Sequence, residues 1–115
     1  MADRLNPGQS LQRGTANNQL RSANGVYTLV MQDDGNLVVY HGTRPLWATN
    51  TAGTDGQRAI MQTDGNFVLY HVNGSPLWAS NTAGRPGSFV IMQNDGNLVI
   101  YQPNVPVWAS NTAGQ

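Results

Sequence analysis

Five side chains recur with the same spacing at three places in the sequence, in the pattern Gln-x-Asp-x-Asn-x-Val-x-Tyr. Amides and phenols can donate and accept hydrogen bonds, whereas a carboxylate only accepts them. Such a set suits the hydroxyls of a small polyol, with the carboxylate making the stronger bonds and the valine lying under a C–H patch. The candidate ligand-binding residues are Gln32, Asp34, Asn36, Val38 and Tyr40; Gln62, Asp64, Asn66, Val68 and Tyr70; and Gln93, Asp95, Asn97, Val99 and Tyr101.

Part of this pattern has a purely structural explanation. Asp-Gly-Asn is good turn chemistry, and valine and tyrosine are common in strands. A turn does not, however, require glutamine before it and tyrosine four residues after the asparagine. The joint recurrence of all five residues therefore favours a ligand site. The Asn-Thr-Ala-Gly segment that follows each copy is interpreted as a turn and nothing more.

Other kinds of site find less support in the sequence. No nucleophile has an evident base, and no acid–base pair recurs, so we predict no catalytic residue and no enzyme. The Asp-Asp-Gly-Asn segment lacks the spacing and the closing glutamate of a calcium loop. His41 and His71 have no third equivalent, because Gln102 stands there, and we interpret them as solvated residues at strand ends. We therefore predict no metal site and no cofactor.

The composition indicates one domain made of short strands. The 115 residues include six arginines and six aspartates but no lysine, glutamate or cysteine, and the net charge is zero. This balance predicts neither a nucleic-acid partner nor a cationic membrane surface. The absence of lysine and glutamate, with 13 glycines, favours strands and turns over helices.

No apolar run resembles a secretory signal or a membrane-spanning helix. If Met1 is the natural start, we expect a cytoplasmic protein without membrane insertion. Release by a non-classical route is left open.

The chain contains three copies of one unit, with motifs at 32–40, 62–70 and 93–101. A Trp-Ala-[Thr/Ser]-Asn-Thr-Ala-Gly segment follows each motif. In the first unit, strands are predicted at 26–32, 36–41 and 46–49. The Asp-Gly pair between the first two is a strong hairpin signal, because glycine tolerates positive φ. Residues 1–115 are thus predicted to form one domain with three internal repeats.

Three such sheets can bury their apolar faces together if they pack around a pseudo-threefold axis. Trp47, Trp78 and Trp108 occur once per unit and are predicted to fill the shared centre. The leader, roughly residues 4–30, is expected to complete the sheets and to pair with the C-terminal strand. Arginines in predicted turns are interpreted as solubilising; they are Arg44, Arg58 and Arg85.

The segments QDDGNLVVY, QTDGNFVLY and QNDGNLVIY, each followed by WA[ST]NT, resemble the monocot mannose-binding, or bulb-type and snowdrop-like, lectin family. The resemblance runs from about residue 4 to the end. It implies an all-β, β-prism II fold with three four-stranded antiparallel sheets, and one calcium-independent mannose site per sheet. The implied partners are mannose and mannose-containing glycans or glycoproteins.

The resemblance also implies a role for each residue of the motif. In the first site Gln32 would bind the third hydroxyl of the sugar, Asp34 and Asn36 the axial second hydroxyl, and Tyr40 the fourth. Val38 would contact the ring carbons. The other two sites follow position by position.

The chain lacks the cysteines that form a disulfide in many plant members of this family, which points towards the cytosolic, bacterial, fungal or animal branches and away from vacuolar or secreted placement. Some members exchange C-terminal strands, and the final VWASNTAG segment is comparable, so a homodimer is expected. The alternative function is a protein-interaction or toxin-like module on the same prism.

Overall fold

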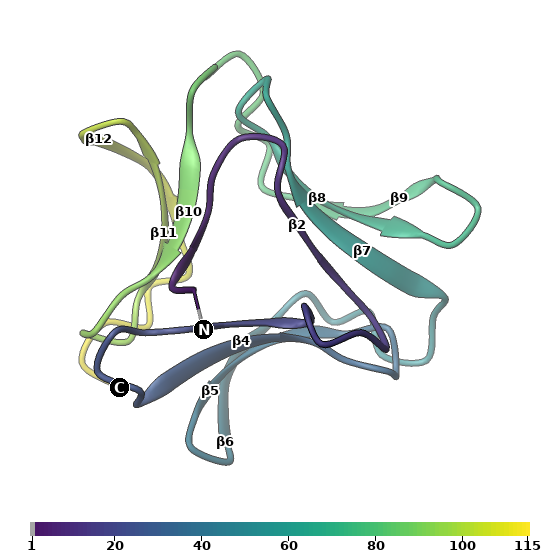
Figure 1. The fold of residues 1–115 in the computed structure, drawn as a ribbon, viewed down its shortest axis with the longest axis horizontal. Coiled ribbons are helices and arrows are strands. Elements are labelled where there is room, and N and C mark those ends of the chain that lie inside the picture. Colours follow the sequence, from purple (N-terminus) through teal and green to yellow (C-terminus); the bar gives the residue numbers. More distant parts are fainter. Residues whose placement is uncertain (1) are drawn as a thin grey trace.

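Three four-stranded antiparallel sheets form the sides of a triangular prism, as Figure 1 shows. The computed structural model describes residues 2–115, and we number the sheets by the repeat that each carries. The first sheet has the order β3 (Gln19–Arg21), β4 (Tyr27–Met31), β5 (Leu37–His41) and β6 (Arg44–Ala48). The second has the order β2 (Ser10–Gln12), β7 (Gly56–Met61), β8 (Phe67–His71) and β9 (Pro76–Ala79). The third has the order β1 (Arg4–Leu5), β10 (Phe89–Met92), β11 (Leu98–Gln102) and β12 (Val105–Ala109).

The repeated motif forms a hairpin in each sheet. In the first sheet β4 and β5 pair from Met31 opposite Leu37 to Tyr27 opposite His41, with the Asp-Gly turn between them. The all-β fold with three sheets, predicted from the repeats, is confirmed, and so are the four strands per sheet that the family resemblance implies. No helix within residues 2–115 is long and apolar enough to cross a membrane.

The inner faces of the three sheets share one apolar core. Along β5, Leu37 and Val39 are fully buried, and they lie on the same face because side chains two residues apart in a strand share a face. Equivalent residues of the other repeats are also fully buried, and they are Phe67, Leu69, Leu98 and Ile100. The exchange of Leu37 for Phe67 is therefore a volume adjustment inside the core.

One tryptophan from each repeat packs against the other two. The ring centroids of Trp47, Trp78 and Trp108 are 5.4 to 5.6 Å apart, and the rings meet edge to face. Aromatic pairs favour this geometry. The three side chains are half-buried and pack against the main core cluster. The predicted central position of the tryptophans is therefore confirmed, at the margin of the core rather than deep within it.

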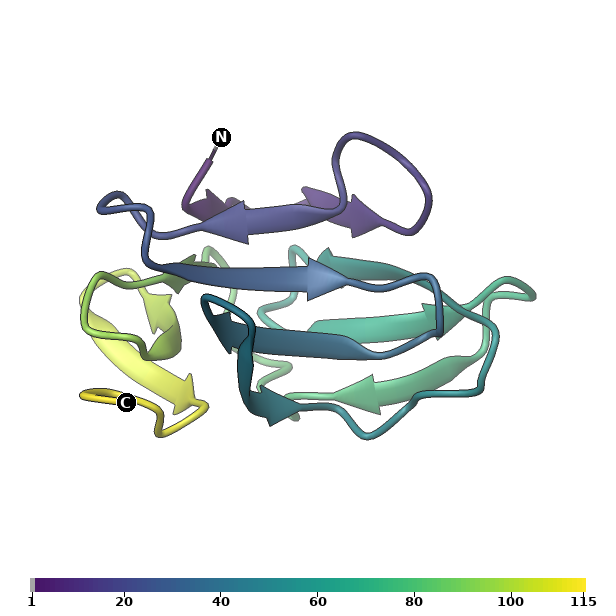
Figure 2. The same cartoon turned by 90° about the horizontal axis from the view of Figure 1, so that it is seen from below.

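The leader supplies one edge strand to each sheet. Its strands β1, β2 and β3 pair with β10, β7 and β4, respectively. Figure 2 shows the leader along one end of the prism. The expectation that it completes the sheets is confirmed, but the predicted pairing with the C-terminal strand is wrong. Strand β12 pairs with β11 on the opposite edge of the third sheet from β1. The expected homodimer stays a prediction.

Two of the arginines assigned to turns lie in strands. Arg58 is in the middle of β7 and Arg44 begins β6, whereas Arg85 lies in the loop before β10. Strand β7 begins at Gly56 and therefore places Arg58 in a sheet and not in a turn.

A β-bulge marks the same point in each sheet. The register between β5 and β6 shifts between Val39 and Tyr40, so that Tyr40 lies opposite Pro45 and Val39 opposite Trp47. The second and third sheets shift at the equivalent tyrosines. Proline has no backbone N–H, and Pro45 is tolerated because β6 is an edge strand. A bulge re-aims neighbouring side chains, and here it occurs at the tyrosine of the motif.

Candidate functional site

The turn of each motif copy brings its polar residues to one end of a hairpin. In the first copy the N–H of Gln32 donates to the carbonyl of Asn36 at 2.9 Å, and Gly35 N–H donates to the carbonyl of Gln32 at 3.2 Å. Gly35 has a φ of 90°, which favours glycine. The second and third turns have the same pair of bonds. The glutamine thus ends one strand, the aspartate lies in the turn, and the asparagine precedes the next strand.

The aspartate has both a structural oxygen and an available one. Oδ1 of Asp34 accepts the N–H of Asn36 at 2.9 Å, and the other two copies repeat this bond at the same distance. The turn interpretation is therefore correct for one oxygen of each carboxylate. Within residues 2–115, Oδ2 of Asp34 and of Asp64 has no protein partner.

The glutamine and the tyrosine of each copy contact each other directly. Nε2 of Gln32 donates to the hydroxyl of Tyr40, and Gln62 makes the same bond to Tyr70. In the third copy the hydroxyl of Tyr101 donates to Oε1 of Gln93 at 2.7 Å. This contact explains why glutamine and tyrosine recur together although they are eight residues apart. It also fixes two half-buried polar groups beside the carboxylate.

The polar side chains of the third site make more hydrogen bonds with one another than those of the other two sites. Nε2 of Gln93 lies 3.1 and 3.3 Å from the two oxygens of Asp95 and can donate to either. Tyr101, Gln93 and Asp95 therefore form one continuous network. A ligand hydroxyl that binds Asp95 has to share this carboxylate with Gln93.

The valine of each motif copy offers a ligand only a small surface. Val38, Val68 and Val99 are exposed to 4%, 4% and 3%, respectively. The central strands thus bury residues on both faces, and the valine surface predicted to lie under a C–H patch of the ligand is largely covered.

Polar residues outside the motif, which were not predicted from the sequence, support the site. Oδ1 of Asn36 accepts the hydroxyl of Thr49 at 3.1 Å and the N–H of Thr51 at 3.2 Å, which leaves the Asn36 amide nitrogen without a protein partner in the described chain. The hydroxyl of Thr51 donates to the carbonyl of Gly35 at 2.7 Å. The other copies repeat this arrangement through Ser80 and Thr82, and through Ser110 and Thr112.

The Asn-Thr-Ala-Gly segment is therefore more than a turn, because it holds the asparagine and the glycine of the motif in place. Asn50 adopts a φ of 59°, which turns the chain so that Thr51 faces the motif. The signal was present in the sequence, since the segment recurs as regularly as the motif itself.

Replacing Thr51 by valine should test this support. The carbonyl of Gly35 would lose its buried donor, so we expect the free energy of unfolding to fall by about 1–3 kcal/mol. Thr43→Val is the matched control, because Thr43 is exposed in the hairpin turn between β5 and β6, and it should change stability by less than about 0.5 kcal/mol. Urea denaturation measures both. Equal stability of the two variants would contradict a supporting role for Thr51.

Each site turn also packs against a neighbouring part of the prism. A Cβ atom on Gly35 would lie 2.4 Å from the carbonyl oxygen of Thr54, just before β7. On Gly65 it would lie 2.2 Å from the carbonyl oxygen of Arg85, before β10. On Gly96 it would lie 2.8 Å from the ring of Tyr27, which begins β4. Each turn is thus a junction to the next sheet, and the motif glycine is needed for close approach as well as for its φ.

The two histidines do not gather with other ligating groups. Nδ1 of His41 lies 3.1 Å from the carbonyl oxygen of Gln115, and its ring packs on Tyr27 at 4.9 Å. No three histidine, cysteine, aspartate or glutamate side chains come together in the part of the chain that the structure describes.

Comparison with known proteins identifies close relatives. No protein-family model matches the chain. A 32-residue segment is 56% identical to a mannose-specific lectin of Narcissus pseudonarcissus and covers 28% of this chain and 29% of that protein. The matched segments span between 22% and 44% of the curated relatives.

Solved structures match over nearly the whole chain. A monomeric monocot mannose-binding lectin from Gastrodia elata is 41% identical, with a TM-score of 0.83, and the match covers 97% of this chain and 99% of that one. The mannose-specific agglutinin of snowdrop, Galanthus nivalis, solved with methyl α-D-mannoside, is 41% identical, with a TM-score of 0.78 and 96% of each chain covered. With this identity over a complete prism, the chain belongs to the monocot mannose-binding, bulb-type lectin family.

Proposed function

We propose that this protein is a lectin that binds mannose and mannose-containing glycans through up to three sites, without calcium and without catalysis. The observation that carries the proposal is the glutamine–tyrosine contact beside a carboxylate, which occurs in all three sheets. It places two fixed polar groups and a charged acceptor at one hairpin end, while the fold uses only part of their hydrogen-bonding capacity.

The polar groups left over by the fold suit a sugar. In the first site these are Oδ2 of Asp34, the amide nitrogen of Asn36, and the O–H and remaining lone pair of the Tyr40 hydroxyl. They combine acceptors with a donor at short range, which is what neighbouring hydroxyls of a pyranose require. The family relatives add support, since the snowdrop agglutinin is described as mannose-specific.

The aspartate of each site is exposed to solvent at the end of a hairpin, so each site should bind a single sugar weakly. A dissociation constant on the order of 1 mM corresponds to about −4 kcal/mol. The three sites lie on three sides of a body of 34 × 34 × 22 Å. Branched glycans that reach more than one site, or surfaces that present many copies, would therefore be held much more tightly than free mannose.

Titration with methyl mannoside and methyl glucoside tests the proposal. We expect methyl mannoside to bind with a dissociation constant on the order of 1 mM. Methyl glucoside should bind at least about tenfold more weakly, because its equatorial second hydroxyl leaves a polar group of the site without its partner. Adding a calcium chelator should change neither value. Equal affinity for both sugars, or no binding of either, would refute mannose recognition.

A further inference from the structure

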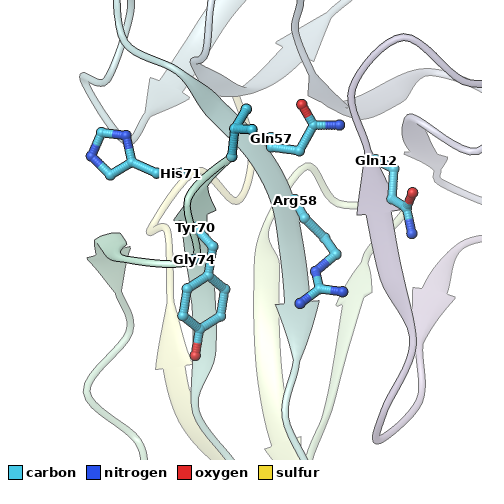
Figure 3. Close-up of a pocket in the computed structure, with 7 residues that line it drawn as sticks. Gln12, Gln57, Arg58, Tyr70, His71 and Gly74 are labelled. Carbon is cyan, nitrogen blue, oxygen red and sulfur yellow. The ribbon is translucent and has the colours of Figure 1, made fainter.

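The second sheet carries a cation where the other two sheets carry uncharged residues. Arg58 on β7 lies directly opposite Tyr70 on β8, and the equivalent partners of the motif tyrosines in the first and third sheets are Thr28 and Phe89. Cross-strand partners share one face of a sheet. Figure 3 shows the Arg58 and Tyr70 side chains next to each other, with their polar ends directed the same way.

Arg58 and Tyr70 line the same hollow, which has a volume of about 320 Å³. Gln12 on β2 lies opposite Arg58 on its other side, so three polar side chains from three neighbouring strands stand in a row. Gln57 and His71 also line the hollow, although the His71 ring is directed away from the row (Figure 3). The hollow thus adjoins the proposed mannose site through Tyr70.

A second hollow continues along the same strand. It has a volume of about 330 Å³, and its lining includes Ile60, Gln62 and Asp64. Ile60 lies between Arg58 and Gln62 on the same face of β7, because side chains two residues apart in a strand share a face. Four residues of extended chain, or about 13 Å, separate the Cα atoms of Arg58 and Gln62. A saccharide in the second site can therefore extend towards Arg58.

No carboxylate of residues 2–115 neutralises the charge of Arg58. Among residues 2–115, the one ion pair joins Arg4 to Asp3 at 3.2 Å. Arg4, in the third sheet, also lies over the ring of Phe89 at 5.1 Å. The Arg58 side chain is exposed and has no carboxylate partner in the described chain. Its guanidinium presents a planar set of donors that matches a carboxylate or a phosphate.

We propose that the second site prefers a mannose-containing saccharide that carries an anionic group, either a phosphate ester or the carboxylate of a uronic acid. Arg58 binds the anion while Gln62, Asp64 and Tyr70 bind the mannose. This inference rests on the proposed function and deepens it for one site. The negative charge of Asp64 lies at the turn end of β7, so an anion is accepted only at the Arg58 end.

NMR titration can read the three sites separately through the backbone amides of Gly35, Gly65 and Gly96, one in each site turn. The ligands are methyl mannoside, mannose 6-phosphate and a disaccharide of glucuronic acid and mannose. At low ionic strength, we expect the Gly65 midpoint to be about fivefold lower for at least one anionic ligand than for methyl mannoside. The Gly35 and Gly96 midpoints should show no such preference, and added salt should remove it at Gly65. Comparing the midpoints for the two anionic ligands shows whether the phosphate or the carboxylate is preferred.

Arg58→Gln should abolish the preference at Gly65 and leave methyl mannoside binding unchanged. Arg21→Gln is the matched control, because Arg21 is an exposed arginine on the edge strand of the first sheet, and it should keep the preference. The inference is overturned if the preference survives in Arg58→Gln, or if methyl mannoside shifts Gly65 and neither anionic ligand binds more tightly. Failure of all three ligands at all three amides would instead overturn the proposed function, and this inference with it.

Discussion

Replacing Gly65 by alanine should destabilise the protein by about 2–5 kcal/mol, which is a large part of the stability of a small domain. Two costs add together. The residue has a φ of 95°, which costs an L-residue about 1–2 kcal/mol. The added methyl group would also lie 2.2 Å from the carbonyl oxygen of Arg85, and relieving such overpacking costs about 1–3 kcal/mol more. The free energy of unfolding in urea measures the sum.

Gly74 offers a control that separates these two costs. Its φ is 89°, but a Cβ atom there would meet nothing within 4 Å. Gly74→Ala should therefore lose only the conformational part, about 1–2 kcal/mol. If both variants lose the same stability, the close approach of the second site turn to the segment before β10 is unimportant, and the description of the turns as junctions is wrong.

Replacing the three site aspartates by asparagine should abolish retention on immobilised mannose. The variant Asp34→Asn with Asp64→Asn and Asp95→Asn removes three charged acceptors. A hydrogen bond to a charged group contributes about 1.5–3 kcal/mol, so each site should lose about tenfold or more in affinity. Losses at all three sites combine when a multivalent surface is bound. Retention on mannose-agarose and calorimetry with an oligomannoside measure the effect.

The fold should survive this triple change, because asparagine keeps the Oδ1 atom that accepts the N–H two residues later. Asp33→Asn is the matched control, since Asp33 is an exposed neighbour in the first turn and is replaced by Thr63 and Asn94 in the other copies. The control should bind like the original protein. If the triple variant binds as tightly as the original protein, the three carboxylates do not contribute to mannose binding.

The hairpins and the core were predictable because a strong local sequence pattern specifies each of them. Asp-Gly between apolar runs specifies a turn, and the alternation of Leu37 and Val39 with outward residues specifies the buried face. The three-fold repetition then required a shared core, which Trp47 and its two equivalents complete. These features depend on side chains close in sequence or on exact repetition.

The pairing of the leader was not predictable in the same way. Strands β1 and β2 have two and three residues, which is too short for an alternation to be recognised. Their partners are set by the closure of the whole prism. The prediction that Arg58 lies in a turn was wrong for a related reason. Gly56 is of a residue type common in turns, but it begins β7 and packs against the carbonyl of Gly35.

The candidate site was predictable as a set of residues but not as a network. Their joint recurrence with the turn residues identified Gln32 and Tyr40 as members of the site. The hydrogen bond between them explains why they recur together. The support from Thr49 and Thr51 was missed, since Asn-Thr-Ala-Gly has an adequate local explanation as a turn. The burial of Val38 was not foreseen, because the alternation of side chains along a strand assigns this residue to the outward face.

The pairing of β1 with β10 bears on how the chain is made. Arg4 lies opposite Ile91 and Leu5 opposite Val90, so the third sheet takes one edge from residues at the far end of the chain. During translation Leu5 leaves the ribosome long before its partner exists. Closing so long a loop costs entropy that only the finished sheet repays. The third sheet is therefore completed only after synthesis of the third repeat. Until then the Leu5 side chain of the nascent chain stays exposed to solvent and chaperones.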